Sequence, residues 1–149
     1  MDSAVTILLV EDDAGDQVLT KRAFAKSKIT NDIYVVETGE EALDYLFHRG
    51  KYANLKDAPI PSLILLDVNL PKKTGLEVLV EIRKCDKTRK IPIVILTTSR
   101  QKRDVDLAYE LGANSFISKP IDVPKFLQIV QSLEGYWLQV VRLPSQEEG

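Results

Sequence analysis

The segment Leu63-Ile64-Leu65-Leu66-Asp67 is the strongest indicator of the fold class of this chain. Its four consecutive apolar residues predict a strand that is buried on both faces, as in parallel sheets covered by helices. A carboxylate follows at once, and in open α/β sheets ligands bind beyond the carboxyl ends of the strands. Taken alone, Asp67 could simply cap the turn that begins at Val68. The rest of the chain decides between these interpretations.

Four more short apolar segments flank this strand, and helical patterns alternate with them. The strands are expected at 5–10, 33–36, 63–66, 91–96 and 115–118, and the helices at about 14–26, 39–49, 76–84, 100–111 and from 122 to as far as 143. Strand–helix alternation repeated five times predicts an α/β fold with a doubly wound, five-stranded parallel sheet. We expect one domain over 1–149, with a core at about 4–134, a C-terminal helical extension at about 135–143 and a disordered tail at 144–149.

Several positions carry more detailed predictions. The expected apolar sides are Val18, Leu19, Ala23 and Phe24 in the first helix and Leu76, Leu79 and Ile82 in the third. Thr38, with Glu41 three residues later, is typical of a capping box at the start of the second helix, and Gly50 is expected to end that helix. Gly112 is expected to end the fourth helix. Residues 51–61 lack periodicity and predict an exposed loop, which is long for a compact α/β domain.

The composition excludes several classes of protein. Apolar residues make up 44% and charged residues 28% of the 149 residues, and the formal net charge is −2. A nucleic-acid footprint would need a clear basic excess, and a membrane span would need roughly 18 consecutive apolar residues. The single cysteine, Cys85, excludes an intramolecular disulfide and fits a reducing compartment. No secretory signal is expected at the N-terminus, so we expect a soluble, cytoplasmic protein.

Polar residues with related chemistry stand at the ends of four of the strands. They are Glu11 and Asp12 after the first strand, Asp67 after the third, Thr97 after the fourth and Lys119 after the fifth. Three carboxylates at one edge repel each other and tend to recruit a cation, and an all-oxygen set with few protein ligands suits Mg²⁺. Two charges from the cation and one from Lys119 would offset the three carboxylates, so the site could accept a phosphoryl group. Thr97 adds a hydroxyl donor.

With these motifs in view, the chain resembles the receiver domain of two-component response regulators over essentially its whole length. The matching segments are Leu8-Leu9-Val10-Glu11-Asp12-Asp13, Leu65-Leu66-Asp67-Val68-Asn69-Leu70-Pro71, Gly75-Leu76-Glu77, Thr97-Thr98 and Lys119-Pro120. The resemblance implies the (βα)5 flavodoxin-like receiver fold. It also implies a single-domain response regulator of a phosphorelay, since the rest of the chain is too short for a DNA-binding domain.

The resemblance further implies a role for each residue of the site. Asp67 would accept a phosphoryl group from a histidine of a sensor kinase, as an acyl phosphate. Mg²⁺, which Mn²⁺ or Ca²⁺ could replace, would be held by Glu11, Asp12, Asp67 and the backbone carbonyl of Asn69. Thr97 would follow the phosphoryl group and Lys119 would pair with it. Phe116 matches the aromatic switch position, where the family often has tyrosine; phenylalanine keeps the packing change and loses the hydroxyl.

The chain has none of the motifs of a conventional enzyme. It contains no Walker A sequence, no Gly-x-Gly-x-x-Gly and no Gly-x-Ser-x-Gly. The only histidine, His48, stands at an expected helix end, so we expect a solvated side chain there and a phosphodonor in another protein. We therefore expect a phosphoacceptor that assists its own phosphorylation and dephosphorylation by positioning and electrostatics.

The last helix has more apolar surface than one domain face requires. At about 100° per residue its apolar positions span roughly 220°, which is wider than the stripe of an ordinary surface helix. The stripe beyond the core face consists of Ile129, Leu133, Tyr136, Val140 and Leu143. The extra residues could fold back on the domain, or Gly135 could break the helix. Our hypothesis is a homodimer through this helix and the neighbouring edge of the fifth strand.

Two segments outside the chemical site resemble one subfamily of receivers. His48-Arg49-Gly50-Lys51-Tyr52 and the ending Tyr136 to Pro144 resemble the stand-alone response regulators of bacterial, especially cyanobacterial-type, phytochromes. The resemblance then implies a light-sensing histidine kinase as the donor, and regulators that dimerise.

Three other functions are compatible with parts of this pattern. A pseudo-receiver would use the same fold as a binding module without phosphorylation, and Asp67, Thr97 and Lys119 argue against it. A phosphatase of the haloacid-dehalogenase type would need a second aspartate where Asn69 stands. A flavodoxin-like flavin carrier is compatible with the fold alone.

Overall fold

The computed structural model describes residues 5–27, 31–54, 58–98 and 102–119, together with 122, 124, 125 and 128. Five parallel strands form one sheet in the order β2-β1-β3-β4-β5. The strands are β1 (Val5–Val10), β2 (Asn31–Val36), β3 (Leu63–Asp67), β4 (Ile93–Thr97) and β5 (Ser115–Ser118). The helices are α1 (Ala14–Ser27), α2 (Gly39–Phe47), the short 3₁₀ helix η1 (Gly50–Tyr52), α3 (Gly75–Lys84) and α4 (Lys102–Glu110).

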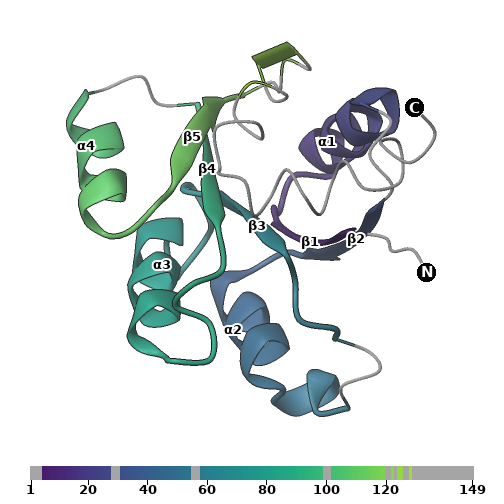
Figure 1. The fold of residues 1–149 in the computed structure, drawn as a ribbon, viewed down its shortest axis with the longest axis vertical. Helices are drawn as coiled ribbons and strands as arrows, with labels where there is room; N and C mark the ends of the chain where they lie inside the picture. The colour runs from purple at the N-terminus through teal and green to yellow at the C-terminus, as the bar shows by residue number, and fades with distance from the viewer. Residues whose placement is uncertain are drawn as a thin grey trace, which may run out of the picture.

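This arrangement confirms the doubly wound α/β fold. Figure 1 shows α1 on one side of the sheet and α2 and α3 on the other. The central strand β3 is buried at all five positions, as its unbroken apolar run predicts. β4 begins at Ile93 rather than Ile91, and the expected bounds of the other strands are close to those found.

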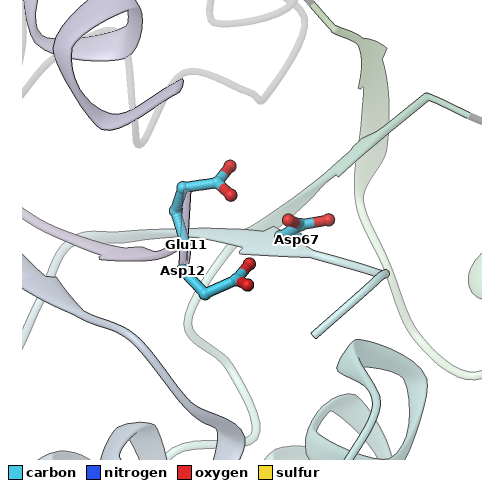
Figure 2. A group of neighbouring side chains, drawn as sticks. All are labelled: Glu11, Asp12 and Asp67. Atoms are coloured by element: carbon cyan, nitrogen blue, oxygen red, sulfur yellow. The ribbon is translucent and has the colours of Figure 1, made fainter. Parts of the chain in front are cut away.

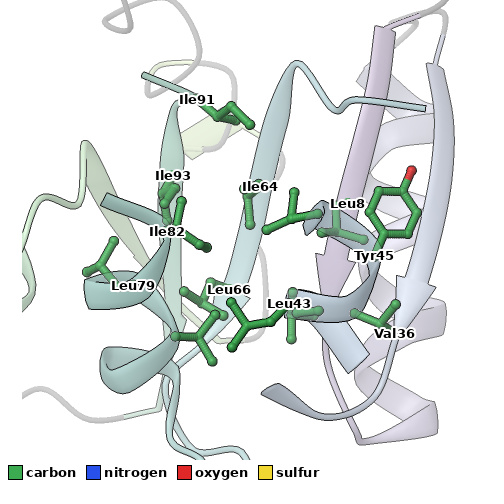
Figure 3. Packing of buried hydrophobic residues seen from close by; sticks show 14 of the residues in the cluster. Leu8, Val36, Leu43, Tyr45, Ile64, Leu66, Leu79, Ile82, Ile91 and Ile93 are labelled. Carbon is green, nitrogen blue, oxygen red and sulfur yellow. The ribbon is translucent and has the colours of Figure 1, made fainter. Parts of the chain in front are cut away.

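The larger part of the core lies between the sheet and the helices α2 and α3 (Figure 3). Alternate residues of the central strands point into it, as the two-residue period of a strand requires. They meet apolar residues of the two helices; the cluster includes Leu8, Val10, Ile64, Leu66, Ile93 and Ile95 from the sheet, Ala42, Leu43 and Leu46 from α2, and Val78, Leu79 and Ile82 from α3. Leu79 and Ile82 are buried as expected, Leu76 is half-buried, and Val78 was missed.

The prediction for α1 was half wrong. Ala23 and Phe24 are buried, but Val18 and Leu19 are 47% and 44% exposed. The buried side of the helix is completed by Thr20, which lies one helical turn before them. A polar residue in the buried stripe and apolar residues outside it explain why the sequence pattern was weak.

The two ends of α2 differ in detail from the prediction. Thr38 accepts a hydrogen bond from the Glu41 N–H, but the Glu41 carboxylate turns to the N–H of Glu37, so only half of the capping box forms. The helix ends at Phe47, and the residue at its C-terminal cap is His48, in the left-handed conformation (φ 56°), although Gly50 also has a positive φ of 58°. Gly50 instead begins η1.

The segment 51–61 is not simply an exposed loop. Ala58 is fully buried and Pro61 is buried as well. The Tyr45 hydroxyl donates to the carbonyl of Pro59, and the His48 ring donates through Nε2 to the carbonyl of Ala58. The other ring nitrogen of His48 lies 2.9 Å from Nζ of Lys87. The expectation of a solvated His48 was therefore wrong, because both ring nitrogens hold protein partners.

The remaining predictions have mixed outcomes. Gly112 has a positive φ of 113° just after α4, which confirms it as the stop. In the part of the chain that the structure describes, no helix has the length and apolar character to cross a bilayer. The proposed extension at 135–143, the tail at 144–149 and the dimer residues Ile129, Leu133, Tyr136, Val140 and Leu143 lie outside the described residues.

Candidate functional site

Three carboxylates from two neighbouring strands meet beyond the end of the sheet. Val10 is paired with Leu66, so the residues that follow β1 stand beside the last residue of β3. One oxygen each of Glu11, Asp12 and Asp67 lies within 4.8 Å of the others (Figure 2). Glu11 and Asp67 are buried, while Asp12 is exposed to solvent. The predicted convergence of these carboxylates is therefore seen in the geometry.

Lys119 joins this group from the end of the edge strand β5. Its backbone N–H donates to the carbonyl of Thr97, which places it just beyond β5. Its Nζ lies 2.9 Å from Oδ2 of Asp67 and 2.9 Å from Oε1 of Glu11. Nζ also lies 2.9 Å from Oδ2 of Asp16, in the first turn of α1. Asp16 was not predicted, and the only signal for it was that α1 starts directly after the strand end that carries Glu11 and Asp12.

Burial sets the electrostatics of this group. Burial, with added repulsion from Asp67, raises the pKa of Glu11 to about 7, although the hydrogen bond from Lys119 opposes the change. For Lys119, burial alone would lower the pKa, but its hydrogen bonds to Glu11, Asp16 and Asp67 outweigh burial and raise it. The Lys119 ammonium therefore stays charged, but it does not fully compensate the buried carboxylate of Glu11, whose pKa remains raised. This donor set fits a hard divalent cation.

The backbone after β3 orients the Asp67 carboxylate. One of its oxygens, Oδ1, accepts the N–H of Asn69 at 2.9 Å, and the other accepts from Lys119. The N–H of Val68 donates to Leu96 on β4, and its carbonyl accepts from Gly75 at the start of α3. The side chain of Asp67 is thus held from both sides. The role expected for the Asn69 carbonyl has no direct support in these contacts and stays a prediction.

The two residues expected to respond to the acceptor lie on β4 and β5. Thr97, the last residue of β4, is 3% exposed and is paired with Ser118. Phe116 is half-buried in β5 and packs edge-on against Tyr109 of α4, with ring centroids 6.2 Å apart and an interplanar angle of 83°. The aromatic pair links the strand beside Thr97 to α4. Tyr109 was not singled out from the sequence, because only the fold brings it to Phe116.

The chain matches the family model of the response regulator receiver domain over residues 7–131. It belongs to the response regulator receiver family. Receiver domains of this family are in general phosphoacceptors.

Relatives of this receiver are known from several bacteria. The response regulator Rcp1 of Synechocystis sp. is 40% identical over 139 residues, which cover 93% of this chain and 92% of Rcp1. A solved structure of Rcp1 in its Mn²⁺-bound form has a TM-score of 0.74 at 39% identity and covers 92% of this chain and 96% of that one.

Two other solved structures are similar to this receiver. One is the bacteriophytochrome response regulator AtBRR, with 42% identity, a TM-score of 0.78, and coverage of 89% of this chain and 94% of that one. The other is the phosphorylated cyanobacterial phytochrome response regulator RcpA, with 41% identity, a TM-score of 0.76, and coverage of 91% and 95%.

Proposed function

We propose that this chain is a single-domain response regulator in which Asp67 accepts a phosphoryl group from a histidine of a sensor kinase. The observation that carries this proposal is the contact of Lys119 Nζ with Oδ2 of Asp67, beside the carboxylates of Glu11 and Asp12. An amine and an acidic group around one strand-end aspartate supply the positioning and charge compensation that phosphoryl transfer requires.

The acidic group is the proposed Mg²⁺ site. Glu11, Asp12, Asp67 and the backbone carbonyl of Asn69 would hold the cation, and Mn²⁺ or Ca²⁺ could replace it. The Mn²⁺-bound form of the relative Rcp1 supports a divalent cation in this family. When bound, the cation neutralises charge that develops on the transferred phosphoryl oxygens. The protein supplies the orientation of Asp67 through the Asn69 N–H and the Lys119 ammonium.

The proposed output is a change in a protein–protein interaction surface. The Thr97 hydroxyl would bond a phosphoryl oxygen on Asp67, and Lys119 would pair with another. Phe116 would then repack, and its edge-on contact with Tyr109 would carry the change to α4. Phe116 has no hydroxyl, so this readout rests on packing.

The proposed kinase is a phytochrome. Two solved structures that are 41% and 42% identical to this chain are named as phytochrome response regulators, and Rcp1 is 40% identical.

The proposal also includes a homodimer through the last helix, with the contact formed by Ile129, Leu133, Tyr136, Val140 and Leu143. Sedimentation that gives a monomer at high concentration, with and without a phosphate mimic, would contradict the dimer.

The alternative is a pseudo-receiver that binds a partner without being phosphorylated. The two functions are separated by incubating the protein with Mg²⁺ and acetyl phosphate and measuring the intact mass. We expect the wild type to gain one phosphoryl group and Asp67→Asn to gain none. Asp86→Asn, at a side chain that is 97% exposed, is the control and should behave as wild type. Equal masses before and after incubation in all three proteins would support the binding module.

A further inference from the structure

Lys119 uses three carboxylate partners, and only two of them belong to the proposed acceptor and cation site. An ammonium group has three N–H donors, and here Nζ lies 2.9 Å from one oxygen each of Glu11, Asp16 and Asp67. These distances are those of charge-assisted hydrogen bonds. Asp16 stands outside the acidic group of Glu11, Asp12 and Asp67. It is therefore the partner of Lys119 that has no other assigned role.

The local structure of α1 leaves the Asp16 carboxylate available for this contact. Asp13 caps the helix, because its Oδ1 accepts the N–H of Asp16 at 2.9 Å. In a full capping box, the acidic residue three positions on would reach back to the N–H of the cap. Thr74 and Glu77 at the start of α3 do this. In α1 the N–H of Asp13 is instead directed to Glu11 at 3.2 Å, and Asp16 reaches Lys119.

The first turn of α1 is also fixed to the site by a second side chain. Nε2 of Gln17 donates to the backbone carbonyl of Glu11 at 2.8 Å and to Glu37 at 3.2 Å. Asp16 is therefore presented from a turn that is tied to the ends of both β1 and β2. The Asp16 side chain is 30% exposed and the Lys119 side chain 10%. The contact thus lies at the solvent edge of the site, where an unanchored lysine could swing outward.

We propose that Asp16 is a positioning residue that holds the Lys119 ammonium beside Asp67 before, during and after phosphoryl transfer. This inference rests on the proposed function. In the transfer, an oxygen of Asp67 forms a bond to phosphorus while the bond from phosphorus to the donor breaks. The leaving group keeps that electron pair, and Lys119 only donates hydrogen bonds. Asp67 is the acceptor and Glu11 belongs to the proposed cation site, so the surroundings of both carboxylates change in this step. Asp16 is the partner whose hydrogen bond to Lys119 can persist throughout.

The competing explanation is that Asp16 only adds negative charge near the acceptor. The two explanations predict opposite signs. Removing a repulsive charge would speed the reaction with an anionic donor such as acetyl phosphate. Losing the anchor would slow the reaction, since a displaced catalytic group costs rate.

The experiment measures the initial rate of phosphorylation by acetyl phosphate and Mg²⁺, by intact mass, in the wild type, Asp16→Ala and Asp16→Asn. We expect Asp16→Ala to be about tenfold slower. Asp16→Asn keeps an acceptor oxygen at the same place and should be less than about threefold slower. The matched control is Asp86→Ala, which also removes one carboxylate but at a side chain that is 97% exposed and outside these contacts, and which should leave the rate unchanged.

A second readout follows the lysine directly and needs no phosphorylation. The labelling rate of Lys119 by an amine-reactive reagent, measured by peptide mass mapping, should rise in Asp16→Ala and not in Asp86→Ala. An Asp16→Ala rate equal to or above wild type would overturn the inference, and so would equal slowing in Asp16→Ala and Asp16→Asn. If the wild type itself takes up no phosphoryl group, the proposed function fails, and unchanged labelling of Lys119 overturns the positioning role separately.

Discussion

Gly75, the first residue of α3, lies directly against the backbone of Asp67, the last residue of β3. A Cβ atom at position 75 would overlap the carbonyl oxygen of Asp67 and would lie 2.8 Å from the Cα of Val68. The N–H of Gly75 donates to the Val68 carbonyl at 3.0 Å. The start of α3 is therefore seated on the same backbone that orients the proposed acceptor.

This close contact predicts the effect of Gly75→Ala. The obstacle is backbone, which cannot move aside as a side chain can, so we expect the free energy of unfolding to fall by about 1–3 kcal/mol. We also expect slower phosphorylation, because the backbone at Asp67 must shift. Gly15→Ala is the control: its Cβ would meet only the Asp13 side chain, at 3.2 Å, and we expect a change within about 1 kcal/mol. Urea unfolding of the two variants compares them directly.

The raised pKa of Glu11 predicts how stability depends on pH without metal. The folded protein holds a proton on Glu11 up to about pH 7, whereas the unfolded chain releases it near its ordinary pKa of 4.5. The folded state therefore binds more protons between these values, and its stability falls as the pH rises through them. We expect Glu11 to account for a loss of about 1–3 kcal/mol between pH 5 and 8 in EDTA.

The control for this prediction is Glu11→Gln, which cannot titrate and should show a flatter pH dependence of unfolding. Mg²⁺ should restore stability to the wild type at pH 8, because a bound cation offsets the charge on Glu11. Glu41 does not interfere in this window. Burial acts to raise the pKa of Glu41, but hydrogen bonds from the Glu37 N–H and the Tyr52 hydroxyl outweigh burial and lower it. The stability that the Glu41 carboxylate contributes is therefore lost only as the pH falls below 4.5. Parallel slopes for wild type and Glu11→Gln would contradict the prediction.

Arg83 fastens the end of α3 to the turn between α4 and β5. Its guanidinium donates to the carbonyls of Gly112, Arg89 and Ile91 and to the side chain of Asn114, at 2.8–2.9 Å. Lysine cannot reproduce this planar fork, so we expect Arg83→Lys to lower the free energy of unfolding by about 1–3 kcal/mol. Arg89→Lys, at an exposed ion pair with Asp86, should change it by less than about 0.5 kcal/mol. Similar stabilities for both variants in urea would show that the fork contributes nothing.

The hydroxyl of Tyr45 anchors the segment before β3. It donates to the carbonyl of Pro59 at 2.7 Å, and Tyr45 is 1% exposed. Tyr45→Phe would leave that carbonyl without this donor, and we expect the free energy of unfolding to fall by about 1–2 kcal/mol, together with faster proteolysis near residues 58–61. Tyr109→Phe, at a residue that is 44% exposed, is the control and should unfold as wild type does within about 0.5 kcal/mol.

Sequence patterns predicted well where burial dictates residue type. β3 was predicted because a strand buried on both faces must be apolar throughout, and it is buried at every position. The pattern failed in α1, where Thr20 takes a buried position and Val18 and Leu19 are exposed. It failed again at His48, whose ring is held by Ala58 and Lys87, residues that no local pattern connects to it.

The parallel α/β sheet could be inferred from the amino-acid sequence alone, and so could the order in which acid, hydroxyl and amine reach its carboxyl edge. Apolar runs and strand-end residues are local features, so they can be read without coordinates. The contact of Asp16 with Lys119, and the need for a glycine where α3 begins against Asp67, became visible only in the folded chain. These relationships depend on distances of a few ångströms between segments far apart in the chain, and only packing sets such distances.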